Sequence, residues 1–437
     1  MDPLKKKILH LALPAALNNF LDTVQLLIDM LMVGRLSPEA IASVGLSGQL
    51  IILIYAFLST FYTGTNALVS RFYGAKEYKK ADKTVFNLLI VSFLTSFPFF
   101  FFCLTQNHVY FELMGTDQDV LELGSKYISI LSYSLPFLFV GSVLYSGLNA
   151  SGDTKTPLII GIFTNLINTL LNYCLIFGNC GFPRLEVEGA AIATTISYIL
   201  EVLIFLAVFL LKIRKITLYP EFDFQLIKKA LKIGVPAGIE KVLSFSSFLV
   251  FVKIIAGFGT FVLAGYQIGL RIEGLAFMPG FGFAVASMVL VGQFLGANEI
   301  EKAERSVIET VKLASIFMGS IGIFLIIFPE YLVMFFTQDE KTVQEASLYL
   351  KIVGISQIPL AVEFVLNGAL RGAGATKLTL VVNNLSFWIF RIIPSFFAAI
   401  FLKEIIFVYL IMVFETFIKA FLLWFFFKKG NWKYIEV

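Results

Sequence analysis

The chain has 437 residues, of which 58% are hydrophobic and 15% are charged, and its mean hydropathy is +0.85. Soluble globular proteins are roughly 45–50% apolar and about 25% charged, so this composition excludes that class and indicates a multi-pass membrane protein. The net charge of +4 is small, and the three cysteines and two histidines show no metal-ligand or disulfide spacing. We therefore expect neither a metal cluster nor a disulfide framework.

Twelve apolar runs are each long enough to cross a bilayer core of about 30 Å, which takes about 20 helical residues. The runs lack the period-two alternation of a membrane β-barrel, so we expect an all-α integral membrane protein. Lys5 to Lys7 lead directly into the first run, which we interpret as a retained helix rather than a signal peptide. The runs span residues 8–33, 43–70, 84–106, 124–150, 157–178, 189–213, 230–256, 263–293, 306–330, 346–370, 378–401 and 404–428.

Positive charge alternates between the gaps that separate these runs. The even-numbered gaps hold most of the Lys and Arg residues, as in Lys76 to Lys83, whereas the odd-numbered gaps hold acids such as Asp117 and Glu186. Short cytoplasmic loops carry an excess of Lys and Arg in membrane proteins. We therefore expect both termini in the cytoplasm and the chain in the plasma (inner) membrane.

The sequence repeats itself at an offset of 222 residues. The segment "LVSRFYGAKEYKKADKTV" at 68–85 matches "LVGQFLGANEIEKAERSV" at 290–307, and "SGDTK" at 151–155 matches "AGATK" at 373–377. A shorter match pairs "LPA" with "VPA" at the same offset. Several matches at one offset indicate a duplicated six-helix unit.

An even number of helices per unit gives both halves the same topology, so we expect two pseudo-symmetric six-helix lobes related by an axis along the membrane normal. We predict an N-lobe of helices 1–6 in residues 1–212, a cytoplasmic linker at 213–229 and a C-lobe of helices 7–12 in residues 230–437. Two such bundles favour alternating access by rocking against each other. No phosphate-binding GxxxxGK[ST] loop is present, which favours an ion gradient as the energy source.

Motifs in both halves, among them "DMLMVGRLSPEAIASVGL", "GLNASGDTKTPL", "FMPGFGFAVASMVLVGQFLGA" and "LNGALRGAGATK", together resemble the multidrug and toxic compound extrusion (MATE) family. The resemblance runs over nearly the whole chain. It implies twelve transmembrane helices in two lobes that form a V-shaped central cleft. It also implies export of cationic or amphiphilic organic compounds in exchange for H⁺ or Na⁺.

The first run carries a polar stripe, because Asn18, Asp22, Gln25 and Asp29 recur at i, i+4, i+7 and i+11 on one helical face. A charge in the bilayer is expensive and often functional. The resemblance places the family's helix-1 aspartate at Asp29, which we expect to bind the coupling ion. Asp22 is not part of the family pattern, but it shares a helix face with Asp29 and is a second candidate carboxylate. The alternative is that Asp29 lies near the outer helix end and reaches water.

The resemblance also places an Asn at Asn168 and an Asp at position 172, where this chain has Asn172 instead. We predict an N-lobe ion site of Asp29, Asn168, Asn172 and Thr194, with Asp22 as a second carboxylate. Its possible Na⁺ ligands are Asp29, Asn168 and Asn172. The alternative for the amides is interhelical hydrogen bonding without an ion.

In the C-half, Glu240, Glu273 and Glu363 lie inside predicted helices and could converge on a cation or substrate site. Alternatively they pair with nearby cations and are structural. Glu415 and Lys419 are spaced i, i+4 and are interpreted as a structural ion pair. The candidate cations for the first three acids are Lys241, Lys253, Arg271 and Arg391.

These observations predict a secondary active antiporter, not an enzyme, that works by alternating access as a monomer in the lipid bilayer. We expect no cofactor beyond the coupling ion, small cationic or amphiphilic substrates, and no nucleic acid partner. A flippase for a lipid-linked substrate in the same superfamily is the alternative. An intramembrane enzyme would need a nucleophile–base pair or a metal cluster, and a channel would not need duplicated, proline-bent lobes. The sequence leaves the substrate and the choice between H⁺ and Na⁺ open.

Overall fold

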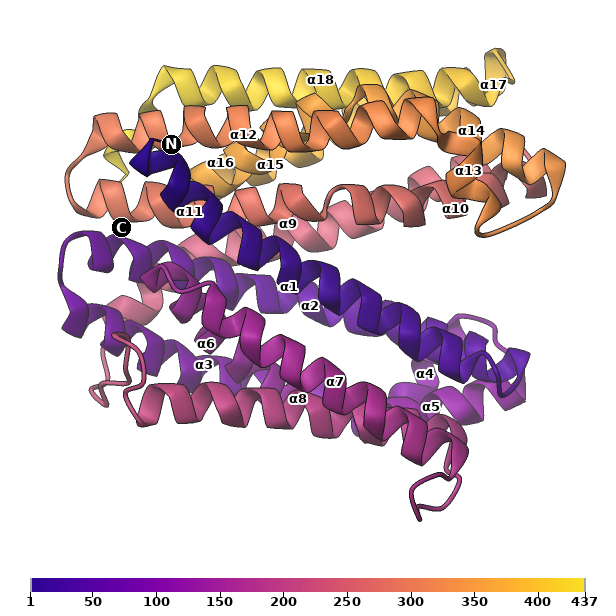
Figure 1. The fold of residues 1–437 in the computed structure, drawn as a ribbon, viewed down its shortest axis with the longest axis horizontal. Coiled ribbons are helices and arrows are strands. Elements are labelled where there is room, and N and C mark those ends of the chain that lie inside the picture. The colour runs from indigo at the N-terminus through magenta and orange to yellow at the C-terminus, as the bar shows by residue number, and fades with distance from the viewer. Residues whose placement is uncertain (1, 436–437) are drawn as a thin grey trace. The chain divides into compact units, whose positions relative to one another are not determined.

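The computed structural model describes residues 2–435, and within them all regular structure is helical (Figure 1). The first half of the chain contains α1 (Pro3–Val33), α2 (Pro38–Gly74), α3 (Tyr78–Thr105), α4 (Asn107–Leu113), α5 (Gln118–Ser132), α6 (Leu135–Ser151), α7 (Lys155–Phe177) and α8 (Glu186–Leu210). The second half contains α9 (Phe224–Ala256), α10 (Thr260–Ala276), α11 (Met278–Gly296), α12 (Ile300–Ile327), α13 (Pro329–Met334), α14 (Glu340–Ile355), α15 (Gln357–Gly372), α16 (Thr376–Ser386), the π-helix η1 (Phe387–Ile392), α17 (Ile393–Phe401), α18 (Ile405–Lys429) and the short 3₁₀-helix η2 (Asn431–Tyr434).

Each of the twelve predicted runs falls on a helix or on consecutive helices. Three runs predicted as single helices, 124–150, 263–293 and 346–370, are each interrupted between two helices, and the interruption in 263–293 lies at Phe277, between α10 and α11. Helices α5 and α6 meet at 52°, and α14 and α15 meet at 58°. Pro136 and Pro359 lie in the first turn of the second helix of each pair, where the missing N–H costs least and a new helix can begin.

Within residues 2–435, nine helices are long and apolar enough to cross a membrane, and eleven spans result if each bent pair counts as one. The remaining predicted run, 230–256, lies in α9 and carries Glu240, Lys241 and Lys253. These charges lower its hydropathy, and the run completes the predicted set of twelve.

The chain forms two compact units. One, here the N unit, is Asn18–Gly234, and the other, the C unit, combines the segment that ends at Leu17 with the segment that begins at Val235. The predicted lobe limits divide the chain at the linker, whereas these units divide it inside α1 and α9. Both long helices therefore contribute residues to the two units. The predicted lobe limits describe the sequence repeat, and the two compact units do not coincide with them.

In the N unit, α2 packs against α3, α5 and α6, and α7 packs against α8. The start of α9 lies on α2 through a close contact of small residues. A Cβ atom on Gly64 would lie 2.5 Å from the carbonyl oxygen of Ala230, so only glycine permits this approach.

The C unit has two hydrophobic clusters. One lies among α11, α12, α15 and α18, includes Phe283, Leu366 and Phe427, and receives Ile8 from the start of α1. The other surrounds the tyrosines Tyr266, Tyr349 and Tyr409.

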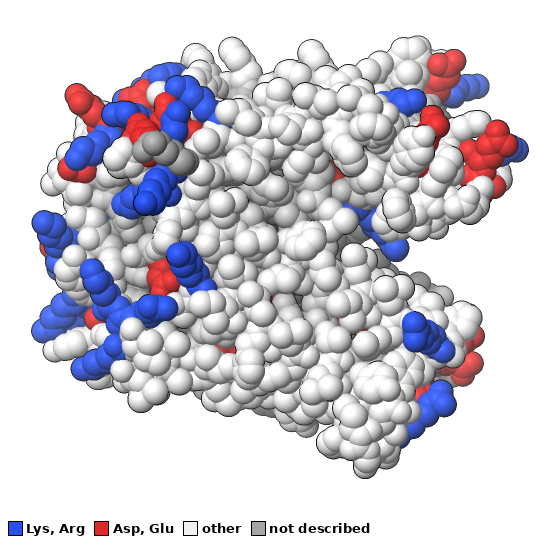
Figure 2. All heavy atoms as spheres, in the orientation of Figure 1, with Lys and Arg blue, Asp and Glu red and all other residues white. Residues whose placement is uncertain are grey.

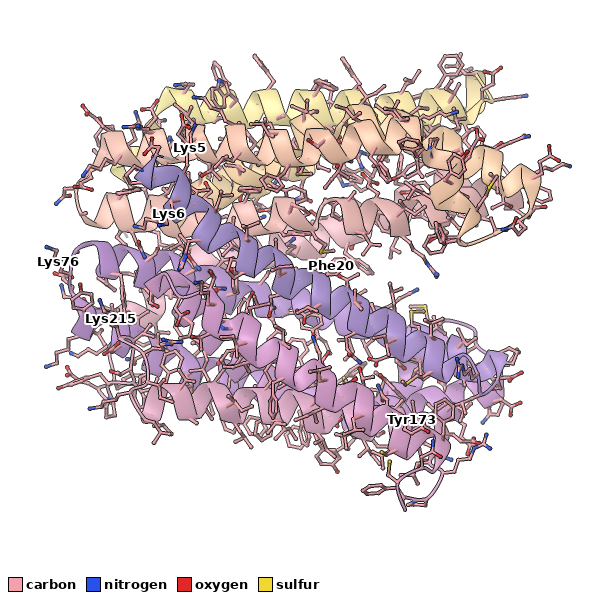
Figure 3. The ribbon with its side chains drawn as sticks, in the orientation of Figure 1. Lys5, Lys6, Phe20, Lys76, Tyr173 and Lys215 are labelled. Atoms are coloured by element: carbon pink, nitrogen blue, oxygen red, sulfur yellow. The ribbon has the colours of Figure 1, made fainter. Side chains whose placement is uncertain are left out.

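Charged residues gather at the ends of each unit, and a broad uncharged band lies between (Figure 2). Lys76 and Lys215, from two of the predicted basic gaps, lie at the same end of the N unit, and Tyr173 lies toward the other end (Figure 3). The uncharged band is the surface expected to face lipid.

Candidate functional site

The polar stripe of α1 meets a matching stripe on α7 inside the N unit. Asp29 Oδ1 accepts hydrogen bonds from Gln25 Nε2 at 2.7 Å and from Asn172 Nδ2 at 2.6 Å. Asn168 Oδ1 accepts from the same two nitrogens, at 2.6 Å from Gln25 and 2.9 Å from Asn172. The i, i+4 spacing on each helix brings these four side chains onto facing sides.

Asp22 occupies the next level of the same seam. Its carboxylate accepts from Asn18 Nδ2 at 3.2 Å and from Asn165 Nδ2 at 3.3 Å. Asp22 and Asp29 are thus both held by neutral amide donors. Among residues 2–435, neither forms an ion pair with a Lys or Arg side chain.

One hydrogen-bond acceptor beside Asp29 accepts no hydrogen bond from the described residues. Asn172 is 0% exposed, and its Oδ1 atom has no hydrogen-bond partner among the described residues. Buried polar atoms are usually satisfied, so an unpartnered acceptor next to an uncompensated carboxylate can interact with a cation or with the hydroxyl of a protonated acid. No group of three or more His, Cys, Asp or Glu side chains that could hold a metal ion is present in residues 2–435.

Thr194 is connected to this cluster through Tyr127. It is a hydrogen-bond neighbour of Tyr127, and Tyr127 is in turn an electrostatic neighbour of Asp29. The five predicted N-lobe residues are therefore brought to one region, with Tyr127 of α5 as an addition that the sequence analysis did not include.

Glu201 of α8 is an acid near this cluster that sequence reasoning missed. It is an electrostatic neighbour of Asp22. Tyr55 is close to both acids and donates to Tyr198 Oη at 3.2 Å. Glu201 is the one charged residue within the predicted run 189–213 before Lys212, and this position was a sufficient signal to find it.

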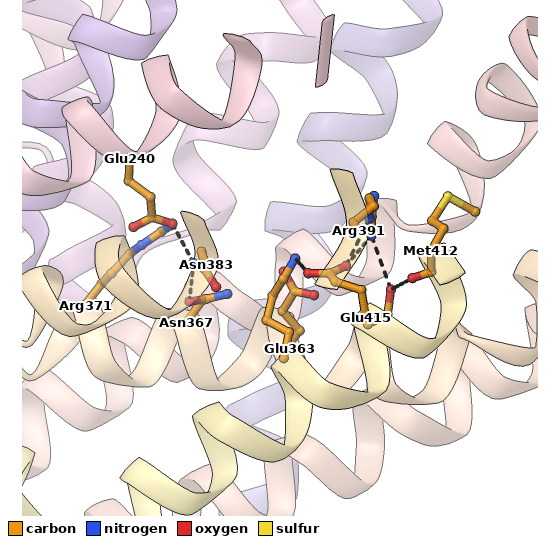
Figure 4. Close-up of polar contacts among 10 residues, drawn as sticks. Glu240, Glu363, Asn367, Arg371, Asn383, Arg391, Met412 and Glu415 are labelled. Atoms are coloured by element: carbon orange, nitrogen blue, oxygen red, sulfur yellow. Dashed lines mark hydrogen bonds and ion pairs between the residues drawn. The ribbon is translucent and has the colours of Figure 1, made fainter. Parts of the chain in front are cut away.

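In the C unit, Glu240 is neutralised by a cation (Figure 4). Arg371 Nη2 lies 2.7 Å from its Oε1, Asn383 Nδ2 donates to Oε1 at 2.6 Å, and Thr379 Oγ1 donates to Oε2 at 2.8 Å. Asn367 Oδ1 accepts from Asn383 at 2.9 Å and so holds that amide in place.

Glu363 and Glu415 belong to a second network of the C unit (Figure 4). Lys419 Nζ lies 3.4 Å from Glu363 and 2.9 Å from Glu415, so the predicted i, i+4 pair of Glu415 with Lys419 is confirmed. Glu415 also pairs with Arg391 at 2.5 Å. Arg391 comes from the π-helix η1, and its guanidinium lies over the ring of Phe387.

Glu273 stands apart from both networks in its bonding, because its Oε2 accepts from Tyr349 Oη at 2.5 Å. The three C-half acids thus do not converge on one cation site. Glu240 and Glu363 pair with cations, as the structural alternative predicted, but the partners are Arg371 and Lys419 rather than the four cations named from the sequence. Neither partner is at a helical spacing from its acid.

An all-helical, duplicated chain with carboxylates inside membrane-crossing helices is a multi-pass membrane transporter by architecture. The family model MatE matches residues 14–174 and 236–397, once in each half, and the chain therefore belongs to the MatE family. This result confirms the resemblance read from the motifs.

Relatives and solved structures agree with this assignment. A protein of Thermotoga maritima described as "Probable multidrug resistance protein NorM" is 31% identical over 400 residues, which cover 90% of this chain and 85% of that protein. A structure of a Vibrio cholerae MATE transporter variant has a TM-score of 0.92 and 21% identity over 99% of both chains. A MOP superfamily transporter from Pyrococcus furiosus has a TM-score of 0.92 and 20% identity over 99% of this chain and 97% of its own. The two structures are similar in fold.

Proposed function

We propose that the protein is a secondary active antiporter that exports cationic or amphiphilic organic compounds in exchange for H⁺ or Na⁺ by alternating access. The observation that carries the proposal is the seam between α1 and α7. There, Asp22 and Asp29 are held by amide donors and by no described cation.

An uncompensated carboxylate inside a membrane-crossing helix is costly, so uptake of a proton or a small cation lowers the free energy of the protein. An ion drives transport only if its affinity differs between the two conformations of the carrier. The hydrogen bonds from α7 supply such a difference, because any shift of α1 against α7 changes the number of donors at Asp29. We therefore assign ion coupling to Asp29, with Asn168 and Asn172 as its positioning residues.

The assignment of the acids in the C unit follows from their partners. Arg371 compensates Glu240, and Lys419 lies beside Glu363, so neither acid is available to a coupling ion without first losing an internal cation. We assign these two pairs a structural role, and we leave Glu273 as the C-unit acid that can still meet a substrate cation.

The relatives support the type of substrate. The Thermotoga maritima protein and a Bacillus subtilis protein 28% identical over 384 residues are both described as probable multidrug resistance proteins. Acidic side chains beside tyrosines, as at Asp22, Glu201, Tyr55 and Tyr198, suit organic cations with apolar bodies.

The test is transport in vesicles reconstituted with the purified chain and loaded with a fluorescent organic cation. A pH gradient and a Na⁺ gradient are imposed in separate experiments, and we expect efflux with one of them. Asp29→Asn should abolish gradient-driven efflux, while Asp119→Asn, a change of the same kind at an exposed helix start, should transport normally.

Wild-type transport by Asp29→Asn would remove Asp29 from the mechanism. Efflux with neither gradient, combined with movement of a lipid-linked substrate between leaflets, would favour the flippase alternative.

A further inference from the structure

An apolar groove opens on the C unit between the last turns of α9 and the segment formed by η1 and α17. Its volume is about 1060 Å³, which is at the upper limit of small-molecule pockets. Phe258, Phe396, Phe397 and Ile400 contribute to its wall. Phe396, Phe397 and Ile400 are 47–53% exposed, so this wall is open to its surroundings.

Two lysines, one from each side, line this otherwise apolar groove. Lys253 belongs to the last turn of α9, and Lys403 lies between α17 and α18. Both are exposed, and the ammonium group of neither makes a hydrogen bond, ion pair or ring contact with any residue in 2–435. Glu404 follows Lys403 in the sequence but does not line the groove.

The other lysines at this end of the C unit differ from these two. Lys351 lies 3.8 Å from Glu330, and Lys341 lies over the ring of Phe261. On the predicted orientation this end faces outside, where short loops carry few cations. Two uncompensated lysines here therefore need an explanation beyond membrane topology.

We propose that this groove is a binding site for one anionic phospholipid. An acyl chain lies along the apolar wall, and the phosphate lies at the ammonium groups of Lys253 and Lys403, whose aliphatic stems follow the groove while the charged ends reach the headgroup level. The apolar wall together with the two lysines distinguishes an anionic phospholipid from two simpler occupants, a free anion and a zwitterionic lipid. A free anion makes no contact with the apolar wall, and the ammonium group of a zwitterionic lipid cancels the negative charge that its phosphate would place at the two lysines.

The site differs from the Asp29 cluster in unit, in charge and in ligand. It does not rest on the proposed transport function. It adds a dependence on membrane composition, because the groove joins α9 to the helix segment that carries Arg391. A lipid bound there contacts both elements at once.

The test is native mass spectrometry of the delipidated, full-length chain in detergent, titrated separately with palmitoyl-oleoyl phosphatidylglycerol and phosphatidylcholine. One lysine near a headgroup changes anionic-lipid affinity by about fivefold, so we expect wild type to prefer phosphatidylglycerol by about 25-fold. Lys253→Gln and Lys403→Gln should each reduce this preference about fivefold, and the double variant should lose it.

The matched control is Lys341→Gln with Lys351→Gln, which removes the same charge at the same end of the unit but outside the groove. It should keep the preference. Ile400→Ser should weaken both lipids alike, because it changes the wall and not the charge. The single variants keep the test valid if the double variant does not fold.

Three results would overturn the proposal. The first is equal affinity of wild type for the two lipids. The second is an equal loss of preference in the control pair, which would mean that net charge alone acts. The third is displacement of phosphatidylglycerol by inorganic phosphate at equal concentration, which would make the lysines a site for free anions.

Discussion

Asp29 and Glu240 are carboxylates inside membrane-crossing helices, and different neighbours hold them. Asp29 accepts hydrogen bonds from amides, whereas Glu240 lies 2.7 Å from a guanidinium nitrogen of Arg371. An amide orients a carboxylate without cancelling its charge, but a guanidinium cancels it. The first arrangement can therefore bind and release an ion, while the second is stable only as long as the pair is intact.

Loss of an ion pair should cost most at Glu415, because this carboxylate is 0% exposed and lies between Arg391 and Lys419. We expect Glu415→Gln to destabilise the protein by about 3–5 kcal/mol, because it leaves the partly buried guanidinium of Arg391 without its carboxylate and Lys419 with Glu363 alone. Thermal unfolding in detergent measures this loss. Glu404→Gln, an exposed acid that begins the same helix, is the control and should unfold as the wild type does.

A wild-type melting temperature for Glu415→Gln would mean that water reaches Arg391 and Lys419. The network would then not be the buried cluster that the structure describes.

At the scale of elements, small residues determine how closely helices approach. Gly368 and Gly372 are one turn apart on α15 and face α11. A Cβ atom on either would lie 2.2 Å from a backbone carbonyl oxygen, of Ala284 or of Met288. This is the small-xxx-small spacing that lets helix backbones pack in a membrane.

We expect Gly368→Ala or Gly372→Ala to cost about 1–3 kcal/mol, because the backbone of α11 cannot yield as a side chain could. Gly274→Ala is the control, since nothing lies within 4 Å of the place that its added Cβ atom would take, and it should leave stability unchanged or improve it. Unfolding in detergent mixtures compares the three variants. Equal stability of all three would show that α11 and α15 are less tightly packed.

The start of α14 depends on a cap that responds to pH. The Thr342 hydroxyl donates to Asp339 Oδ2 at 2.6 Å and the Thr342 N–H donates at 2.8 Å, and these bonds hold the pKa of Asp339 below its usual value. A carboxylate with a lowered folded-state pKa stabilises the fold above its ordinary pKa, and this contribution is lost as pH falls through the lowered value.

Asp339→Ala should therefore speed amide hydrogen exchange in the first turn of α14 at neutral pH. The difference from wild type should vanish in acid below the lowered pKa of Asp339. Glu340→Ala, a change at the adjacent acid, should have a smaller effect because Asp339 and not Glu340 accepts the cap hydrogen bond. A pH-independent difference would show that the cap acts through shape and not through charge.

At the scale of the whole molecule, the duplication decides the topology. The MatE model matches once in each half, and each half contains an even number of predicted runs. Two halves of even span number return the chain to the side from which it began, so both termini should be cytoplasmic.

This orientation is measured with a short epitope at either terminus and protease applied to sealed vesicles of known sidedness. Both epitopes should be protected when only the outer face is accessible. An epitope in the loop between α7 and α8 should be cleaved under the same conditions and serves as the control. Epitopes on opposite sides would require an odd number of spans and would overturn the count of twelve.

Much of the fold of this protein can be predicted from the sequence alone. Local hydropathy over about 20 residues locates the membrane-crossing helices, and an offset of 222 residues reveals the repeat, because both depend only on neighbouring residues or on matching segments. The polar stripe of Asn18, Asp22, Gln25 and Asp29 can also be predicted from the sequence, because spacing within one helix determines which residues share a face.

Contacts between helices far apart in sequence were decided by the tertiary structure alone. Arg371 reaches Glu240 across 131 positions, and Asn172 reaches Asp29 across 143. No periodicity within one helix encodes which cation faces which acid, because the packing of separate helices brings those partners together. The fold therefore determined which carboxylates are compensated by cations and which are held by amide donors alone.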